Sequence, residues 1–374
     1  MTTVIAEREL RFERAGRLRW HERAAPRLQD QTDALVRPFL AGRCDGDTLP
    51  IHRPVSRALQ AGLALGLVDP VVGRICGSVP FRGPFPIGHE CVAEIVELGS
   101  EVTELRVGQQ VIVPWAVSCG SCPRCVRGLT SACDRTDGAL AAFGFGSSCG
   151  PWGGMIADSV RVPYAAHMLV PVPPGVPAER VAAASDNLAD AWRAVVPALS
   201  DRPGGSVLIL GGGARSIGLY AAGLAVAHGA GVVDYVDRSA GRREIAESFG
   251  ARVPARPDRP HRGYDVVVEA GSTAAGLRQA LRSAAPGGVC TAVGYYLATG
   301  TRVPLMHMYA TDVTLRLGVS HARALLPELL EFVRRTGFPA ERVTTVTADW
   351  DDAPTAYATR TTKLVLRRDP VSAG

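Results

Sequence analysis

The chain has 374 residues, 47% of them apolar and 21% charged, and it is longer than one hydrophobic core usually holds, so we expect two domains. This composition excludes a disordered chain, a collagen-like rod and a disulfide-rich miniprotein. The formal net charge is only +5 and the basic residues are scattered along the chain, so we expect no nucleic-acid partner.

No segment of the sequence is typical of export or of membrane insertion. Residues 1–20 alternate charged and apolar side chains, which is unlike a secretory signal. Apolar runs such as LYAAGLAVAHGAGVV are interrupted by Gly and His and fall short of the roughly 20 residues that span a bilayer. We therefore expect a cytoplasmic protein with no membrane partner, whose nine cysteines are metal ligands or buried thiols and not disulfides.

The first part of the chain, from residue 1 to about 170, is predicted to be rich in β-strands. Short runs in which apolar and polar residues alternate are separated by Gly, Pro and Asp turns, with no crossover helices between them. Residues 54–81 differ, because they contain RALQAGLALGLVDPVV, an apolar run of helical period.

Residues 171 to about 320 show a different pattern, in which short, wholly apolar strands alternate with helices. We expect strands at 207–210, 232–236, 264–270, 288–294 and 313–319, and helices at 217–228 and 241–249. Such alternation predicts a parallel sheet covered on both faces, the doubly wound α/β arrangement. Residues 321–374 predict one helix and two strands, which most simply rejoin the β-rich first part.

Four cysteines are closely spaced in the segment CGSCPRCVRGLTSAC. Four thiolates in one short loop can complete a tetrahedral shell around zinc and leave no open position, which is typical of a structural site. The alternative is four unrelated buried thiols, but so short a loop offers little core for them. The predicted ligands of this structural zinc are Cys119, Cys122, Cys125 and Cys133.

A second set of candidate ligands is dispersed along the chain. Cys44 lies in the turn AGRCDGD, and His89 and Glu90 lie in FPIGHECVAEIVELG. Together with the cysteine-rich segment and the dinucleotide-binding pattern that follows, this arrangement resembles the medium-chain, zinc-dependent alcohol dehydrogenase family. The resemblance covers nearly the whole chain. It implies a GroES-like catalytic domain at 1–170 and 321–374, with a zinc lobe at 115–135 and an insertion at 54–81, around a Rossmann domain at 171–320.

In that family a catalytic zinc is held by a Cys, the His of the GHE motif and a third Cys, Asp or Glu. By position, the resemblance implies Cys44, His89 and Asp186, and the segment around Asp186 is similar to the formaldehyde dehydrogenase branch. Three protein ligands leave one position for the substrate, where zinc activates an alcohol or carbonyl oxygen during hydride transfer.

Other positions in the first part acquire roles from the same resemblance. Asp47 matches an acidic position that orients the zinc-bound His, Glu90 lies behind the metal, and Trp115 matches a residue that lines the substrate pocket. A core role is the alternative for Trp115.

The chain departs from the family pattern in two places. The hydroxyl that usually relays the alcohol proton is replaced by Gly46, so Thr48 and His52 are candidate substitutes, with an ordinary solvated loop as the alternative. The insertion at 54–81 greatly separates Cys44 from His89, and we favour a lid over the substrate pocket, with an oligomer contact as the alternative.

The predicted cofactor loop lies between an apolar strand and a helix, where bare backbone can approach a pyrophosphate at a helix N-terminus. Arg215 occupies a position that is usually Gly, so the loop is shaped differently or the Arg meets a phosphate. The loop residues are Gly211, Gly212, Gly213, Arg215, Ser216, Ile217 and Gly218.

Asp237 follows the next strand, where a carboxylate accepts the ribose hydroxyls and repels a 2′-phosphate, so NAD is favoured over NADP; the adjacent Arg238 softens that preference. Further cofactor contacts are predicted where later strands end, at Ala270, Gly271 and Gly294. In the family a basic residue lies near the cofactor phosphates, and the only lysine, Lys363, falls at that place.

The sequence therefore predicts an enzyme with two zinc ions per chain that transfers hydride between NAD(H) and a small alcohol, aldehyde or ketone. The alternative is a non-redox or zinc-independent family member that uses the same pocket for elimination, cyclisation or enoyl or quinone reduction. Relatives are commonly dimers or tetramers, so we expect a homodimer or homotetramer.

Overall fold

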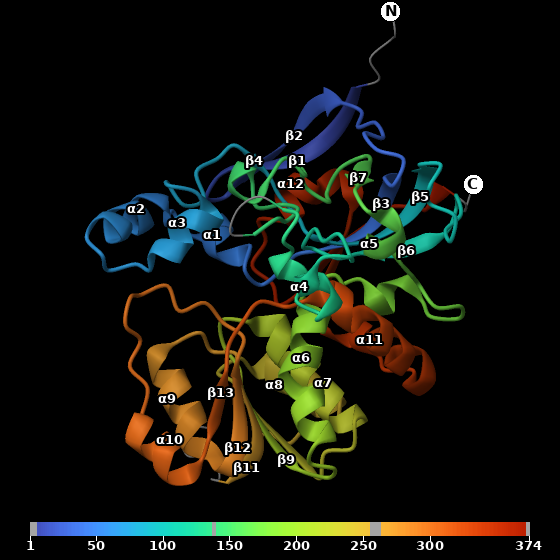
Figure 1. Cartoon of the computed structure of the whole chain (residues 1–374). Helices are drawn as coiled ribbons and strands as arrows, with labels where there is room; N and C mark the ends of the chain where they lie inside the picture. The colour runs from blue at the N-terminus through green and yellow to red at the C-terminus, as the bar shows by residue number, and fades with distance from the viewer. Residues whose placement is uncertain (1–5, 137–139, 255–262, 372–374) are drawn as a thin grey trace, which may run out of the picture. The chain divides into compact units, whose positions relative to one another are not determined.

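The computed structural model describes residues 6–136, 140–254 and 263–371. The chain forms two compact units (Figure 1). The first contains Met1–Asp186, His321–Arg335 and Thr344–Gly374, and the second contains Asn187–Ser320 and Thr336–Val343. The first domain is thus discontinuous in sequence.

The first unit is built on two β-sheets. The smaller has the strand order β2-β1-β4, and the larger has the order β14-β15-β3-β5-β6-β8, with β7 also paired to β3. Strands β14 and β15 come from the end of the chain, and β15 pairs antiparallel with β3, so the tail returns to the first domain as expected. The strands are β1 (Ala6–Arg14), β2 (Arg17–Ala24), β3 (Ala34–Gly42), β4 (Phe85–Pro86), β5 (Glu90–Leu98), β6 (Gln110–Val113), β7 (Val160–Val162), β8 (Val170–Pro171), β14 (Val346–Asp349) and β15 (Leu364–Arg367).

The core of this unit follows from the alternation of side chains along its strands. In β5, Cys91, Ala93 and Ile95 point into one buried cluster, whereas Glu90 and Glu94 belong to the opposite face. Glu90 and Glu94 are nevertheless buried, so this face of the strand is not a solvent face. It carries charged groups that need partners inside the protein.

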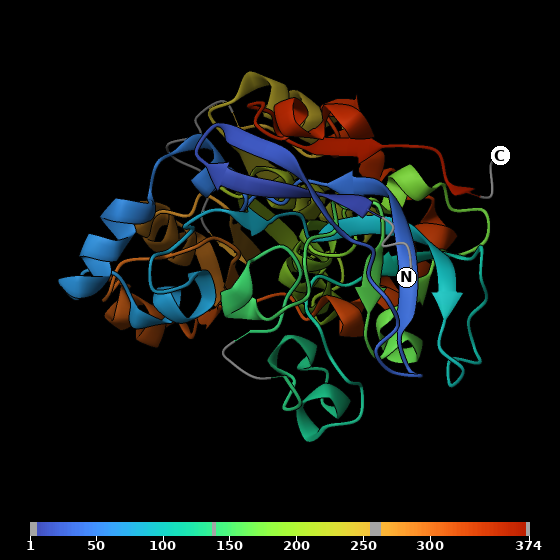
Figure 2. The ribbon, with the colours of Figure 1, turned by 90° about the horizontal axis from the view of Figure 1, so that it is seen from above.

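Helices in the first unit are short, apart from the one that begins the returning segment. They are α1 (Thr48–His52), α2 (Ser56–Ala64), α3 (Pro70–Cys76), α4 (Pro123–Val126), α5 (Ala165–Met168), α11 (Ala322–Thr336) and α12 (Ala353–Ala356). In Figure 2 the cysteine-rich segment, with α4, extends away from the sheets as a small lobe.

The insertion forms two helices, α2 and α3, and not one continuous helix over its apolar run. Gly66 has a left-handed φ of 67°, which ends the first helix. The side chain of Asp69 then accepts a hydrogen bond from the Val71 amide, and Pro70 occupies the first turn, so a second helix begins there.

The second unit is a five-stranded parallel sheet of order β10-β9-β11-β12-β13, as the alternation of apolar strands and helices predicts. Its helices lie on both sides of the strands, with α9 and α10 on the left and α6 and α7 on the right in Figure 1. The elements are β9 (Ser206–Leu210), β10 (Val232–Val236), β11 (Tyr264–Glu269), β12 (Ala284–Ala292), β13 (Thr314–Arg316), α6 (Asn187–Ser200), α7 (Arg215–Ala227), α8 (Ala240–Ser248), α9 (Ala274–Ser283) and α10 (Leu305–Thr311).

The second unit begins at Asn187, which differs from the expected boundary at residue 171. The intervening residues stay with the first unit because β8 pairs with β6, and because the Ser185 hydroxyl is hydrogen-bonded to the backbone of Cys91. Residues 336–343 join the second unit, where Phe338 stacks on Phe249.

Among the described residues, no helix has both the length and the apolar character that crossing a membrane requires.

Candidate functional site

Cys44, His89 and Asp186 converge inside the first unit, although they are far apart in sequence. Their ligand atoms all lie within 4.8 Å of one another. The Cys44 thiol donates to Asp186 Oδ2 at 3.0 Å, and His89 Nε2 lies 3.5 Å from the same oxygen. One thiol, one imidazole and one carboxylate are a donor set that zinc accepts, and three such ligands leave a fourth position open.

The electrostatics of this cluster favour a cation. Burial raises the pKa of the Cys44 thiol well above its usual value, and the charges of Asp186, Asp47 and Glu90 raise it further. Burial alone would lower the pKa of His89, but Asp47 and Asp186 outweigh it and raise the value to about 9. Without a metal, the negative charges therefore hold protons on both side chains.

Both ring nitrogens of His89 are buried and have no hydrogen-bond partner among the described residues. A buried imidazole in this state is unusual, because polar atoms removed from water are nearly always paired. The residues present therefore fit a metal ion, which would be held by Cys44 Sγ, His89 Nε2 and a carboxylate oxygen of Asp186.

Asp47 lies on the other side of the His89 ring. Its Oδ1 is 3.8 Å from His89 Nδ1, which is longer than a hydrogen bond, and its Oδ2 accepts a bond of 2.8 Å from the Tyr357 hydroxyl. Next to Cys44, the buried guanidinium of Arg43 donates to the carbonyl oxygens of Tyr357 and Thr359. Residues of the returning segment thus hold the Cys44 turn in place.

The structure does not support the expectation that Lys363 faces the cofactor phosphates. Lys363 is fully buried, donates to the Arg43 carbonyl at 3.0 Å and forms an ion pair with Glu90. Its ammonium group neutralises the Glu90 carboxylate within the first unit, because a buried carboxylate needs a cation beside it. Glu90 does lie beside the candidate ligands, but it is held by this lysine.

The two candidates for proton relay have other partners in the structure. The Thr48 hydroxyl donates to the carbonyl of Asp45 at 2.7 Å, within the first turn of α1. His52 Nε2 donates to the carbonyl of Ala358 at 3.2 Å. Thr48 therefore stabilises its own turn and His52 binds the returning segment, and neither of these hydrogen bonds is made with a candidate ligand.

Two aromatic rings lie at the candidate metal centre. Phe145 stacks on the ring of His89, with the centroids 4.6 Å apart and the planes 27° from parallel. Trp115 is 4% exposed and packs against Phe145 at 6.0 Å. Trp115 thus packs against a ring at the predicted site that the sequence analysis did not include.

The four lobe cysteines come together as the spacing predicts, with their sulfur atoms within 4.8 Å of one another. Burial alone would raise the pKa of Cys119, but hydrogen bonds from the Ser121 and Cys122 amides outweigh it and lower the value to about 6. The Cys125 amide donates to Cys122 Sγ in the same way, at 3.4 Å. Backbone amides aimed at sulfur stabilise thiolates, which are the form that binds zinc.

In the second unit the glycine-rich loop connects β9 to α7. Gly212 has a φ of 152°, and a Cβ there would lie 2.8 Å from the Cα of Gly271. The amides of Gly213 and Ala214 donate to the carbonyls of Gly271 and Ala270, so Ala270 and Gly271 brace this loop. Because glycines carry no side chain, a pyrophosphate group can come close to the backbone of this loop at the N-terminus of the helix.

The remaining predicted cofactor residues have diverse surroundings. Ser216 is buried and its hydroxyl donates to Asn187 at 3.0 Å, so it is part of the packing of α6 against α7. Gly218 allows close contact with Ala270, and Gly294 lies against Ser272. Ile217 is buried, and Arg215 is half-buried at the start of α7.

Asp237 lies where the sequence predicts it, just after β10, but its carboxylate is already bound by protein donors. Arg242 donates to both of its oxygens at 2.7 Å, and the Ser239 amide and the Tyr235 hydroxyl bind it as well. The neighbouring Arg238 is exposed. A ribose hydroxyl at Asp237 therefore has to share the carboxylate with Arg242.

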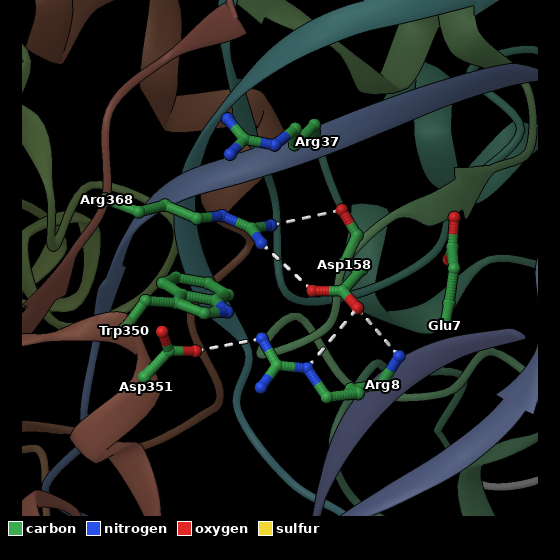
Figure 3. A pocket seen from close by; sticks show the side chains of 7 residues that line it. All are labelled: Glu7, Arg8, Arg37, Asp158, Trp350, Asp351 and Arg368. Atoms are coloured by element: carbon green, nitrogen blue, oxygen red, sulfur yellow. Dashed lines mark hydrogen bonds and ion pairs between the residues drawn. The ribbon is translucent and has the colours of Figure 1, made fainter.

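A separate cavity of about 520 Å³ in the first unit contains none of the predicted site residues (Figure 3). Arg368 donates there to Asp158 and to the carbonyls of Pro38 and Ala157, and Arg8 pairs with Asp158 and Asp351. Because these guanidinium groups are bound to protein acceptors, we assign the cluster to holding the end of the chain against β1 and β3.

Three residues near the metal centre were missed by the sequence analysis: Arg43, Phe145 and Tyr357. Phe145 carries a local signal, since it lies between Gly144 and Gly146, and a bulky residue between two glycines marks a shaped turn. Arg43 and Tyr357 carry none, because their partners lie about 300 residues away along the chain.

Two family models match the chain: the alcohol dehydrogenase GroES-like domain over residues 30–174 and the zinc-binding dehydrogenase over residues 216–335. The chain is 32% identical over 293 residues to a probable zinc-binding alcohol dehydrogenase of Mycobacterium tuberculosis, covering 76% of this chain and 73% of that protein. The structure of an alcohol dehydrogenase from Thermus sp. ATN1 is similar, with a TM-score of 0.82 and 29% identity, covering 97% of this chain and 100% of that one.

The similarity to the formaldehyde dehydrogenase branch is weaker than the residues around Asp186 suggest. Glutathione-independent formaldehyde dehydrogenase of Pseudomonas aeruginosa is 33% identical over 228 residues, which cover only 57% of this chain and 56% of that protein. The comparisons confirm the GroES-like and Rossmann-type fold class.

Proposed function

Because the chain belongs to the zinc-dependent alcohol dehydrogenase family, it is an oxidoreductase that acts on alcohols, and we propose that it uses two zinc ions per chain and NAD. We further propose that the substrate is a small alcohol or its carbonyl product and that the assembly is a homodimer or homotetramer. A cytoplasmic location is part of the same proposal, and it is favoured by nine cysteines that form no disulfide among the described residues.

This proposal rests on one observation. Cys44, His89 and Asp186 come together inside the first unit, and neither ring nitrogen of His89 has a hydrogen-bond partner among the described residues. Zinc held by these side chains supplies a Lewis acid for the oxygen of the substrate. The protein prepares its ligands for that ion: the Gly46 amide donates to Cys44 Sγ at 3.3 Å, which stabilises the thiolate. Asp47 faces His89 Nδ1 and favours a proton there, which leaves Nε2 as the ligand atom.

Asp237 supports NAD as the cofactor. A carboxylate at the end of this strand repels a 2′-phosphate, and Arg242 offsets part of its charge. We expect Asp237→Ala to raise the ratio of activity with NADPH to activity with NADH. Both rates are measured as initial velocities at fixed substrate concentration, and an unchanged ratio would show that Asp237 does not select the cofactor.

The first experiment is the zinc content per chain of protein purified without added metal. We expect two ions in the wild type and one in Asp186→Asn, together with loss of NADH-linked turnover of a panel of alcohols and aldehydes. Cys125→Ser is the matched variant, because it removes a ligand from the lobe site and not from the open site. A wild type with one zinc, lost in Cys125→Ser, and no turnover of any alcohol would contradict the proposal.

A further inference from the structure

We propose that Phe145 is a positioning residue for the metal site: its ring fixes the rotation of the His89 imidazole, and the insertion holds Phe145 in place. This inference rests on the proposed function, because it concerns how one zinc ligand is oriented. It also assigns a role to residues 54–81, which the family resemblance leaves without one.

His89 lacks the hydrogen bond that usually orients a metal-binding histidine. Such a residue donates its second ring N–H to a carboxylate or a carbonyl, and this bond fixes the plane of the ring. Here the nearest carboxylate oxygen to Nδ1, Asp47 Oδ1, is 3.8 Å away, and its partner oxygen is bound by Tyr357. Because rotation about the last torsion of His is soft, another contact has to restrict the ring.

Phe145 supplies that contact. The two rings stack at 4.6 Å with an angle of 27°, so a large rotation of the imidazole would drive its edge into the face of Phe145. Trp115 packs against Phe145 at 6.0 Å and is itself buried, so Phe145 has little room to move aside. The ring of His89 is therefore held by stacking where a hydrogen bond is too long.

The loop around Phe145 is built to bring its ring to this place. Gly144 and Gly146, on either side, have φ values of 74° and 78°, which only glycine adopts without strain. A side chain at Gly144 would overlap the backbone of Gly88, directly before His89. The Gly144 amide also donates to the Gly153 carbonyl at 2.7 Å. The loop thus lies directly against the residue that precedes the ligand.

The insertion is bonded to the same loop. The 3-10 helix η2 (Ser147–Cys149) begins two residues after Phe145 and packs on α3. The Ser148 hydroxyl donates to the Ile75 carbonyl at 2.7 Å, and the Cys149 thiol donates to the same oxygen at 3.3 Å. These bonds connect α3 through η2 to Phe145, and through Phe145 to His89.

The test is the release of zinc from the full chain to a chromophoric chelator, compared between wild type and variants. Phe145→Leu keeps an apolar side chain but removes the flat ring. We therefore expect zinc to leave the open site about 10-fold faster, which is the lower end of the loss in metal affinity when a residue that orients a metal ligand is removed. Release from the cysteine lobe should not change. Phe145→Tyr keeps the ring and should behave as the wild type.

Phe249→Leu is the matched control, because Phe249 is half-buried, stacks on Phe338 at 5.6 Å within the second unit and belongs to neither ligand set. Exchange of cobalt for zinc adds a spectroscopic readout, since a reoriented imidazole shifts the visible absorption bands of the open site in Phe145→Leu only. Wild-type release and an unshifted spectrum in a folded Phe145→Leu protein would overturn the proposal.

If Phe145→Leu does not fold, zinc release is measured in Ser148→Ala instead. This variant removes the hydrogen bond from the Ser148 hydroxyl to the Ile75 carbonyl and leaves the aromatic rings in place. We expect release from the open site about threefold faster, and an unchanged rate would overturn the proposal. Failure of the proposed function is a distinct result, since it would appear in the wild type as a single zinc per chain.

Discussion

Replacing Lys363 with Met should strongly destabilise the first unit. Lys363 and Glu90 are both fully buried and form an ion pair, and Glu90 packs closely against Gly42. The substitution keeps the length of the side chain and removes its charge, so Glu90 loses the cation of this ion pair and has little room to move. Breaking a buried ion pair by removing one partner costs about 3–5 kcal/mol, and we expect a loss of that size.

The double variant Lys363→Met, Glu90→Gln separates the missing charge from the altered packing. Because it leaves no uncompensated carboxylate, it should recover at least about 2 kcal/mol of the free energy of unfolding lost in Lys363→Met. The assay is urea unfolding of the zinc-loaded protein followed by circular dichroism, with the change read from the midpoint at constant slope. A double variant as unstable as Lys363→Met would refute the idea that the lost charge pair of Lys363 and Glu90 causes the instability.

Three further predictions concern other parts of the chain. Burial, followed by the charge of Arg323, lowers the pKa of His167 to about 4. The unfolded chain therefore binds a proton that the folded chain does not, and stability falls as the pH drops from about 6.5 through about 4. His167→Gln should lose less stability than the wild type in urea unfolding between about pH 7 and pH 5, and equal losses would argue against this titration. Chelation of zinc should make the lobe sensitive to trypsin after the exposed Arg124, detected by mass spectrometry, whereas identical fragments with and without chelator would mean that the metal does not stabilise the lobe. Gly212→Ala should weaken NADH binding about 10-fold or more, as measured by fluorescence, because its φ and its contact with Gly271 exclude a side chain; Gly241→Ala, with nothing within 4 Å, is the control that should bind normally.

Elements that depend on neighbours along the chain could be predicted from the sequence. The strand expected at 232–236 is β10, Val232–Val236, and the helix expected at 241–249 is α8, Ala240–Ser248. Periodicity and turn residues report local structure directly. The four lobe cysteines lie within one short loop. Their spacing therefore also predicted a cluster, and the structure contains it.

Features that depend on partners far along the chain could not be predicted. The resemblance implied that Lys363 meets a phosphate, but the fold places its ammonium beside Glu90, 273 residues away in sequence. His52 is a second case, because its ring is hydrogen-bonded to the carbonyl of Ala358, 306 residues away in sequence.

For this protein the sequence by itself determined the order of the elements and the lobe cysteines, because these depend on residue type and spacing, and its resemblance to a family implied the dispersed set of Cys44, His89 and Asp186. Only the tertiary structure decided that Lys363 pairs with Glu90 beside the candidate ligands and that Phe145 stacks on His89. The physical reason is that a buried charge or a soft ring torsion is controlled by whatever the fold brings within a few ångströms. The residue that supplies this contact can come from any distance along the chain, so spacing in the sequence does not identify it.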